Sequence, residues 1–262
     1  MRRVATRIDE LDDGIFRLAT LLPGTGRTVN QFLIDADEPL LFHAGLRATF
    51  PGVIAALARV MPLERLAWLS FSHVEADEMG AMNQWLARVP GLRVLHTPYG
   101  VASSIADLAD RPPVELDDGE ALELGGRRVR LIPTPEVPHN PEAAMLFEEV
   151  TGVLCCSDLG SNDVTHTVVV DELVLAVEAE TAPFPALTSL TAQTPAVLRR
   201  LAALAATTLA VMHGASYRGD VAALLHAFAD DCEGALHGAS RAEMRHLADV
   251  PPAATPHRVP ET

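Results

Sequence analysis

Short apolar or alternating runs separated by turn residues dominate the first fifty positions and predict strands. The runs GIFRLATLL, VNQFLIDAD and PLLFHAG are divided by Pro23-Gly24 and by the acidic segment from Asp35 to Glu38. The segment PGVIAALARVM has helical spacing, and Pro51 suits its first turn. LAWLSFS is a compact apolar run, so it predicts a buried strand that ends in small polar residues.

Strands and helices continue to alternate through the rest of the chain. Two hairpins are predicted, one in ALELGGRRVRLIPTP at Gly125-Gly126 and one in AAMLFEEVTGVLCCSD at Thr151-Gly152. Hairpins interrupted by helices indicate an α/β protein in which two packed sheets carry helices on their outer faces. Further helices are predicted over residues 80–88, 99–110, 183–205 and 218–231, and further strands over 92–97 and 207–212.

The composition shows no break that requires a second domain. We therefore expect one domain over residues 1–249, followed by a mobile Pro-rich tail over 250–262. The net charge of -15 and the absence of clustered Lys and Arg argue against nucleic acid as a partner. The N-terminus lacks an apolar signal-peptide core, and the apolar run LAALAATTLAVM is too short to span a membrane. Three cysteines form neither a disulfide framework nor a zinc-binding spacing, so a cytoplasmic location is expected.

Polar residues that could carry chemistry follow the predicted strands, where α/β folds place their sites. In the string SHVEADE, alternation directs three side chains toward converging positions. Each residue also has an ordinary structural interpretation: a single His near a surface, Asp158 as a turn cap, or Glu78 as an acid at a helix start. The candidates are His73, Glu75, Asp77, Glu78, His139, Asp158 and His213.

The ordered set H-x-E-x-D, then His, Asp and His at long intervals, resembles the metallo-β-lactamase fold. The variant it resembles is carried by flavodiiron proteins and by stand-alone oxygen-binding diiron proteins. The likeness runs from Gly14 to Phe228 and includes HNPE after the second His, CSDLG, MHG and PLLFHAG. It implies an αββα sandwich, in which two mixed β-sheets have helices on both outer faces, and a homodimer.

The resemblance also implies a metal site with two iron ions. Mixed His and carboxylate ligands suit iron, whereas zinc sites are rich in Cys and His. Two-metal hydrolases of this fold have a histidine where this chain has Glu75. A bridging carboxylate would hold the ions ~3.5–4 Å apart. On the family's pattern one iron would be bound by His73, Glu75, His139 and Asp158, and the second by Asp77, His213 and the other oxygen of Asp158.

Several neighbours of this set keep more than one interpretation. Many members of the fold have His where this chain has Glu78, which could ligate the second metal, order a bound water or face solvent. Glu136 is either a partner of a ligating His or a loop acid. His43 lies near a strand end and could approach the site. His166 could line the pocket, and Tyr217 is a candidate hydrogen-bond donor to bound oxygen.

The resemblance implies a non-haem diiron protein that binds or reduces dioxygen or nitric oxide. No FMN-binding phosphate loop is visible, so the chain is expected to bind no flavin. It would then act as a reductase with a separate redox protein, or as an oxygen sensor with a signalling partner. One alternative is a dinuclear zinc hydrolase acting on a thioester, lactone or phosphodiester, with a metal-bound hydroxide as nucleophile. Another is a degenerate domain with a structural role.

Overall fold

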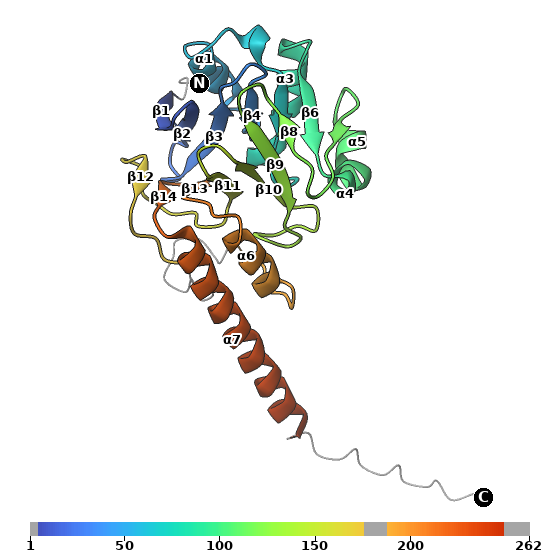
Figure 1. The fold of residues 1–262 in the computed structure, drawn as a ribbon, viewed down its shortest axis with the longest axis vertical. Helices are drawn as coiled ribbons and strands as arrows, with labels where there is room; N and C mark the ends of the chain where they lie inside the picture. The colour runs from blue at the N-terminus through green and yellow to red at the C-terminus, as the bar shows by residue number, and fades with distance from the viewer. Residues whose placement is uncertain (1–4, 176–187, 249–262) are drawn as a thin grey trace, which may run out of the picture.

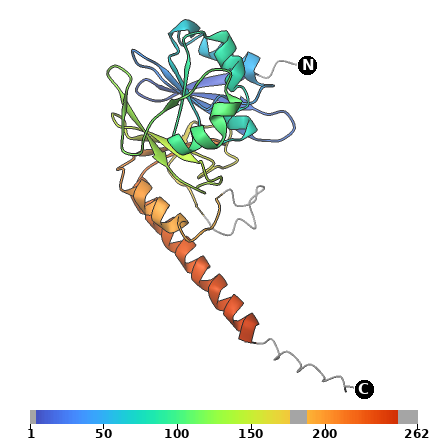
Figure 2. The same cartoon turned by 90° about the vertical axis from the view of Figure 1, so that its right-hand side faces the viewer.

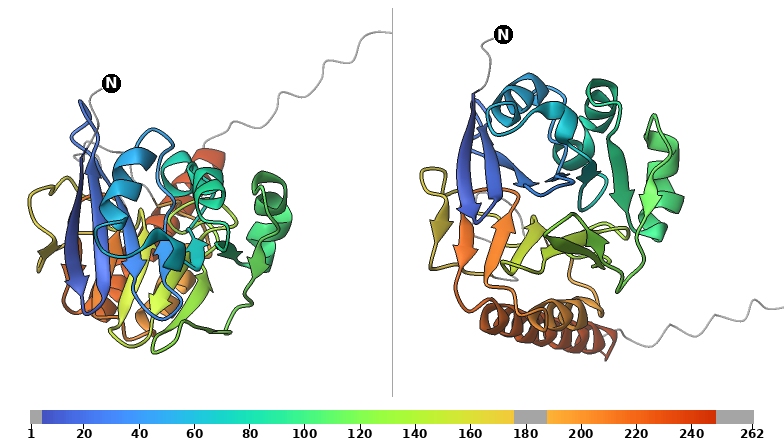
Figure 3. Two further views of the ribbon diagram at one scale, coloured as in Figure 1. Left: turned by 90° about the horizontal axis from the view of Figure 1, so that it is seen from above. Right: turned by 45° about the horizontal axis from the view of Figure 1, so that its top comes forward.

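Two seven-stranded sheets pack face to face in the computed structural model, with helices on both outer faces (Figures 1 and 3). This arrangement confirms the αββα sandwich expected from the sequence. The structure describes residues 5–175 and 188–248. The predicted tail over 250–262 lies outside the described residues.

The first sheet is built from the N-terminal half in chain order, from β1 to β7. Its first four strands are antiparallel and its last three join in parallel. The first strand was not predicted, because TRIDELD is mostly charged and only Thr6 and Leu11 are buried, as befits a sheet edge. The strands are β1 (Thr6–Asp12), β2 (Ile15–Leu21), β3 (Thr28–Ile34), β4 (Leu40–Phe42), β5 (Trp68–Ser70), β6 (Arg93–His96) and β7 (Val114–Glu115).

The second sheet has the order β12-β14-β13-β11-β10-β9-β8. Both predicted hairpins are confirmed, since β8 pairs with β9 and β10 pairs with β11, each antiparallel. Two strands of this sheet, β12 and β14, are too short to show a hydrophobic pattern from which a strand could be predicted. The strands are β8 (Leu122–Glu123), β9 (Arg128–Pro133), β10 (Ala144–Glu148), β11 (Val153–Ser157), β12 (Val169–Val170), β13 (Thr208–Val211) and β14 (Ser216–Arg218).

The helices form the two outer layers. Figure 2 shows α6 and α7 side by side, with α7 extending beyond the body of the protein. It is longer than the predicted segment 218–231. The predicted helix 183–205 contains α6, and its residues 183–187 lie outside the described ranges. The helices are α1 (Phe50–Leu57), the 3-10 turn η1 (Leu63–Arg65), α2 (Ala76–Met79), α3 (Met82–Arg88), α4 (Pro98–Gly100), the π-helical turn η2 (Val101–Ile105), α5 (Ala106–Leu108), α6 (Thr194–Ala202) and α7 (Val221–Ala248).

Three apolar clusters hold these layers together. One lies between the sheets and contains Phe32, Phe42 and Leu146, which are fully buried. The others pack the first sheet against α1 and α3, and the second sheet against α6 and α7. Trp85 of α3 is also fully buried, and its indole N–H donates to the Ala44 carbonyl at 3.0 Å. Among the described helices, none combines the length and apolarity needed to cross a bilayer.

His96 at the end of β6 is a buried structural residue. Its Nε2 lies 3.2 Å from the Ser72 carbonyl, and its Nδ1 lies 3.2 Å from the Thr97 hydroxyl. Burial lowers the pKa of His96 to about 4. The native state therefore excludes a proton that the unfolded chain accepts below a pKa of 6.5.

We expect His96→Gln to flatten the acid dependence of stability in the metal-free protein. Because only the unfolded wild type binds this proton between the two pKa values, wild-type stability falls as the pH drops through that window. The wild type should lose on the order of 1–2 kcal/mol more than the variant between about pH 7 and about pH 5. Urea unfolding of both proteins measures this difference, and the other titrating groups cancel because both proteins contain them. A stability difference that does not change with pH would contradict the assignment.

Candidate metal centre

The loops that carry the predicted ligands meet at one edge of the sandwich. His73 follows β5, His139 lies between β9 and β10, Asp158 follows β11 and His213 follows β13. Backbone hydrogen bonds join the two sheets here: Asn30 N–H donates to the Met212 carbonyl at 3.0 Å. The sequence therefore placed these segments correctly at strand ends.

The first set of donors converges tightly. His73, Glu75, His139 and Asp158 each offer a ligand atom, and these atoms all lie within 4.8 Å of one another. Glu75 Oε2 lies 3.0 Å from His73 Nε2 and 3.2 Å from His139 Nε2. Asp158 Oδ2 lies 3.8 Å and 3.5 Å from the same two nitrogens. Two imidazoles and two carboxylates thus face a common point.

The second set lies on the other side of Asp158. His213 Nε2 is 3.2 Å from Asp158 Oδ1 and 3.4 Å from Asp77 Oδ2. Asp158 therefore presents Oδ2 to one set and Oδ1 to the other. A carboxylate placed in this way suits a bridge between two metal ions.

The ring orientation of His213 is fixed by a distant backbone group. Its Nδ1 lies 2.7 Å from the Thr28 carbonyl. Because a carbonyl can only accept, Nδ1 carries a proton, and Nε2, which faces Asp158 and Asp77, is the nitrogen available to a metal. Gly214 follows at φ +91, and a side chain there would collide with Asn162. The glycine thus permits the turn that presents His213.

The carboxylates and histidines of the site compensate one another in charge. Hydrogen bonds from His139 and His73 hold the pKa of Glu75 well below its usual range. Burial alone would raise the pKa of Asp158, but its hydrogen bond to His213 and the nearby histidines outweigh burial and lower it. Burial and the neighbouring acids raise the pKa of Asp77 despite His213. A cation bound between these acids would provide the same compensation.

Glu78 differs from the other acids of the string. Its side chain is 1% exposed, so the solvent-facing interpretation is wrong. It accepts backbone N–H groups from Ser72 and His73 at 3.0 and 2.8 Å, and the Ser157 hydroxyl also donates to it. The Glu78 carboxylate is therefore held by hydrogen bonds from the loops that carry the predicted ligands.

Two residues considered for catalysis lie elsewhere. Tyr217 packs in the apolar cluster between the second sheet and its outer helices. His166 is exposed on the loop before β12. The structure brings neither into the converging group. Glu136 forms a backbone turn in which its N–H donates to the Asn140 carbonyl at 2.9 Å.

Other residues that shape the site had only a weak signal in the sequence, or none. Asn30 Nδ2 donates to the carbonyls of Val211 and Gly214 at 2.9 and 3.0 Å, which fixes the His213 loop from the opposite sheet. Nothing local in the sequence reveals this contact. Glu142 accepts the Val74 N–H at 3.0 Å and so ties the His139 loop to the His73 loop. The only sequence signal for Glu142 was its place as the acidic residue of the HNPE segment.

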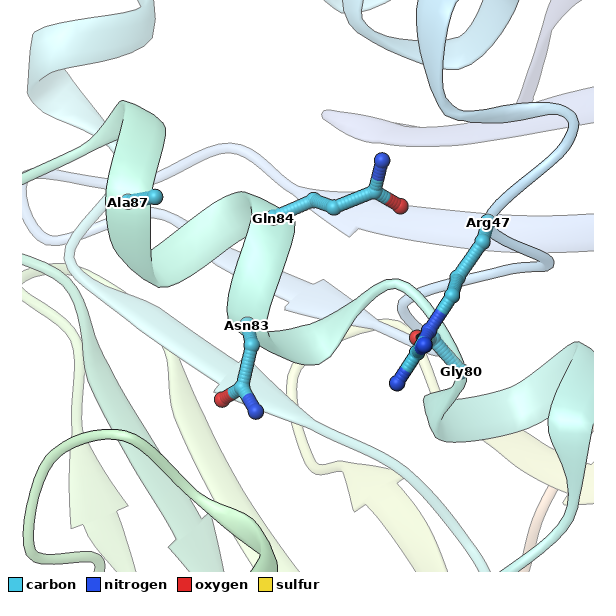
Figure 4. Close-up of a pocket in the computed structure, with 5 residues that line it drawn as sticks. All are labelled: Arg47, Gly80, Asn83, Gln84 and Ala87. Atoms are coloured by element: carbon cyan, nitrogen blue, oxygen red, sulfur yellow. Dashed lines mark hydrogen bonds between the residues drawn. The ribbon is translucent and has the colours of Figure 1, made fainter.

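A surface depression of about 390 Å³ lies beside α2 and α3 (Figure 4). It is lined by Arg47, Gly80, Asn83, Gln84 and Ala87, and Arg47 Nε donates to the Gly80 carbonyl at 2.9 Å. None of the converging donors lines it. The depression is therefore separate from the metal centre.

An αββα sandwich with His and carboxylate donors at its strand ends defines a metallo-β-lactamase-like protein. The chain belongs to the family described as ODP family beta lactamase, whose model matches residues 28–214, more than half of the chain. The resemblance stated from the sequence is thereby confirmed.

Similar curated proteins are named as flavoproteins or as a flavorubredoxin. Type A flavoprotein fprA of Rhodobacter capsulatus is 27% identical over 58% of this chain and 36% of its own length. Anaerobic nitric oxide reductase flavorubredoxin of Aeromonas hydrophila is 26% identical over 51% of this chain and 27% of its own. The chain thus spans about a third of the length of the curated relatives it matches.

Solved structures share the fold over most of the chain. Fragment 1–254 of diflavin flavoprotein A 5 from Nostoc sp. superposes with a TM-score of 0.73 and 17% identity, covering 93% of this chain and 99% of the fragment. The metal-soaked Flv1 flavodiiron core from Synechocystis sp. gives 0.71 and 21%, covering 88% and 61%. At this identity the likeness establishes the fold.

Proposed function

We propose that this chain is a non-haem diiron protein that binds or reduces dioxygen or nitric oxide. The observation that carries the proposal is the position of Asp158, whose two carboxylate oxygens face two separate sets of His and carboxylate donors. The names of its relatives, which include a nitric oxide reductase flavorubredoxin and a flavodiiron core, support it.

The donor set fits iron by its chemistry. The first set would hold one ion through His73, Glu75, His139 and Asp158, and the second set would hold another through Asp77, His213 and Asp158. These are nitrogen and carboxylate oxygen donors, which iron accepts readily, and the described cysteines are buried as free thiols outside the group. When bound, two ferrous ions supply electrons that dioxygen or nitric oxide accepts.

The protein itself orients the donors and leaves one side of the site exposed to solvent. His73 and His213 are buried, at 0% and 5% exposed, so their rings are held rigidly. Glu75 is half exposed and His139 a quarter exposed, so this side of the site faces solvent. A small diatomic molecule could reach the donors from there without any rearrangement of the fold.

Turnover requires a source of electrons beyond the two ions. We propose a separate redox protein as the donor, and the names of the matched relatives, which are flavoproteins, suggest a flavin as its source of electrons. Without a donor, the same site would serve as an oxygen sensor that reports to a signalling partner. A homodimer in the cytoplasm is part of this proposal.

A single-turnover experiment tests the function. Iron-loaded, chemically reduced protein is added to oxygen-containing buffer in the chamber of an oxygen electrode, which records the uptake of oxygen. Zinc-loaded protein serves as the control. We expect oxygen uptake proportional to the iron content and none with zinc, because only iron can be oxidised here. Hydrolysis of a generic thioester by the zinc form, with no oxygen uptake by the iron form, would favour the hydrolase instead.

A further inference from the structure

The buried carboxylate of Glu78 lies against the ring of a predicted ligand. Glu78 Oε2 is 3.3 Å from His73 Nδ1. The Ser72 and Ser157 hydroxyls lie 3.4 Å from the same nitrogen. On its other edge, the His73 ring turns Nε2 toward Glu75 and Asp158. One nitrogen thus faces the metal centre and the other faces Glu78.

Contacts on both oxygens hold Glu78 in place. Oε2 accepts the N–H groups of Ser72 and His73, and Oε1 accepts the Ser157 hydroxyl. Oε1 is also 3.6 Å from His43 Nε2, a fully buried ring whose pKa burial lowers to about 3. A neutral His43 ring can therefore interact with the Glu78 carboxylate only as a hydrogen-bond donor or through its dipole, and not as a positive charge.

The backbone of Glu78 is fixed as well. Its carbonyl accepts the Ala44 N–H at 2.5 Å and the Gly45 N–H at 3.3 Å. Ser157, which donates to the side chain, directly precedes Asp158 and adopts φ +55. Glu78 therefore connects the loop of His73 to the loop of Asp158. These loops lie far apart in the sequence.

We propose that Glu78 is a positioning residue of the metal centre, which keeps the proton of His73 on Nδ1 and its Nε2 lone pair directed at the metal. The proposal rests on the proposed function, because it takes His73 as a ligand. A histidine that binds metal through one nitrogen commonly donates the other N–H to a carboxylate, and loss of that partner costs 10–100-fold in affinity. Glu78 thus acts through His73 and does not itself bind the ion.

Glu148 offers a matched control. It is also a buried acid, at 1% exposed, and like Glu78 it accepts two backbone N–H groups and a hydroxyl, from Val150 and Thr151. Glu148 ends β10 opposite Val153, the first residue of β11, whereas Asp158 follows the other end of β11. Glu148→Gln keeps an oxygen acceptor in this position. A general effect of losing a buried, hydrogen-bonded acid should therefore be seen in both variants.

The experiment compares wild type, Glu78→Gln and Glu148→Gln, each loaded with zinc as a probe that has no redox chemistry. NMR of histidine-labelled protein reports the ring protonation of His73 and the exchange rate of its Nδ1–H. We expect a slowly exchanging Nδ1–H in wild type and Glu148→Gln, and a faster one in Glu78→Gln. Zinc affinity should fall by roughly 10–100-fold in Glu78→Gln and by less than about threefold in Glu148→Gln.

Two results would overturn the proposal. One is a wild-type His73 that carries its proton on Nε2 or exchanges Nδ1–H rapidly, which is decisive even if Glu78→Gln fails to fold. The other is an equal loss of affinity in both variants, which would reduce Glu78 to general structural support. A protein that shows the expected zinc and NMR behaviour but takes up no oxygen with iron would reject the proposed function and leave the role of Glu78 intact.

Discussion

Asp158→Asn is expected to reduce the metal content from two ions per chain to one or fewer. The change keeps the shape of the side chain but replaces one carboxylate oxygen by an amide nitrogen, which cannot ligate in the same way. Because Asp158 faces both donor sets, each set loses a negatively charged ligand. The rate of oxygen uptake should fall by at least about 100-fold, equivalent to about 2.7 kcal/mol of barrier.

Metal analysis of the purified variant and an oxygen electrode measure these effects. Asp163→Asn, which changes an exposed acid in the following loop, is the control and should keep both ions. Thermal unfolding of the two variants shows whether the fold is retained. Full metal content and wild-type oxygen uptake in a folded Asp158→Asn protein would refute the bridging role.

Glu75→His is expected to shift the metal preference from iron to zinc and to abolish the oxygen response. Glu75 lies between the rings of His73 and His139, so the change would place three imidazoles around the first ion. Nitrogen-rich donor sets favour zinc. The variant also lacks the negative charge of Glu75, which would stabilise the higher oxidation state of iron. The expected result is a protein that takes up mainly zinc when both metals are supplied equally.

The comparison is made by growing cells with equal added iron and zinc and measuring both metals in wild type, Glu75→His and Glu75→Asp. The aspartate variant keeps a carboxylate and should retain iron, although its shorter side chain weakens binding. If Glu75→His binds as much iron as wild type and responds to oxygen in the same way, Glu75 does not determine the metal.

The ligand segments were predictable because their signals are local. SHVEADE alternates within seven residues, and the hairpins around Gly125 and Thr151 combine strand patterns with turn residues. These features depend on neighbours in the chain. They therefore place His73, Glu75 and Asp77 at one strand end and Asp158 at another without knowledge of the fold.

The interactions that orient these ligands were not predictable, since they are made across the fold. The Thr28 carbonyl that orients His213 is a backbone group with no side-chain signature. Glu78 has the pattern of a solvated acid at a helix start, and only the fold brings Ser157 and His43 against it. Tyr217 follows His213 closely in sequence, yet the alternation of its strand turns it toward the outer helices.

The most direct test is the iron content of protein purified without oxygen from iron-supplemented cells, with an absorption spectrum before and after exposure to air. The account predicts two irons per chain and a new visible absorption band when oxygen is admitted. Zinc as the bound metal, with no spectral response to oxygen, would contradict it.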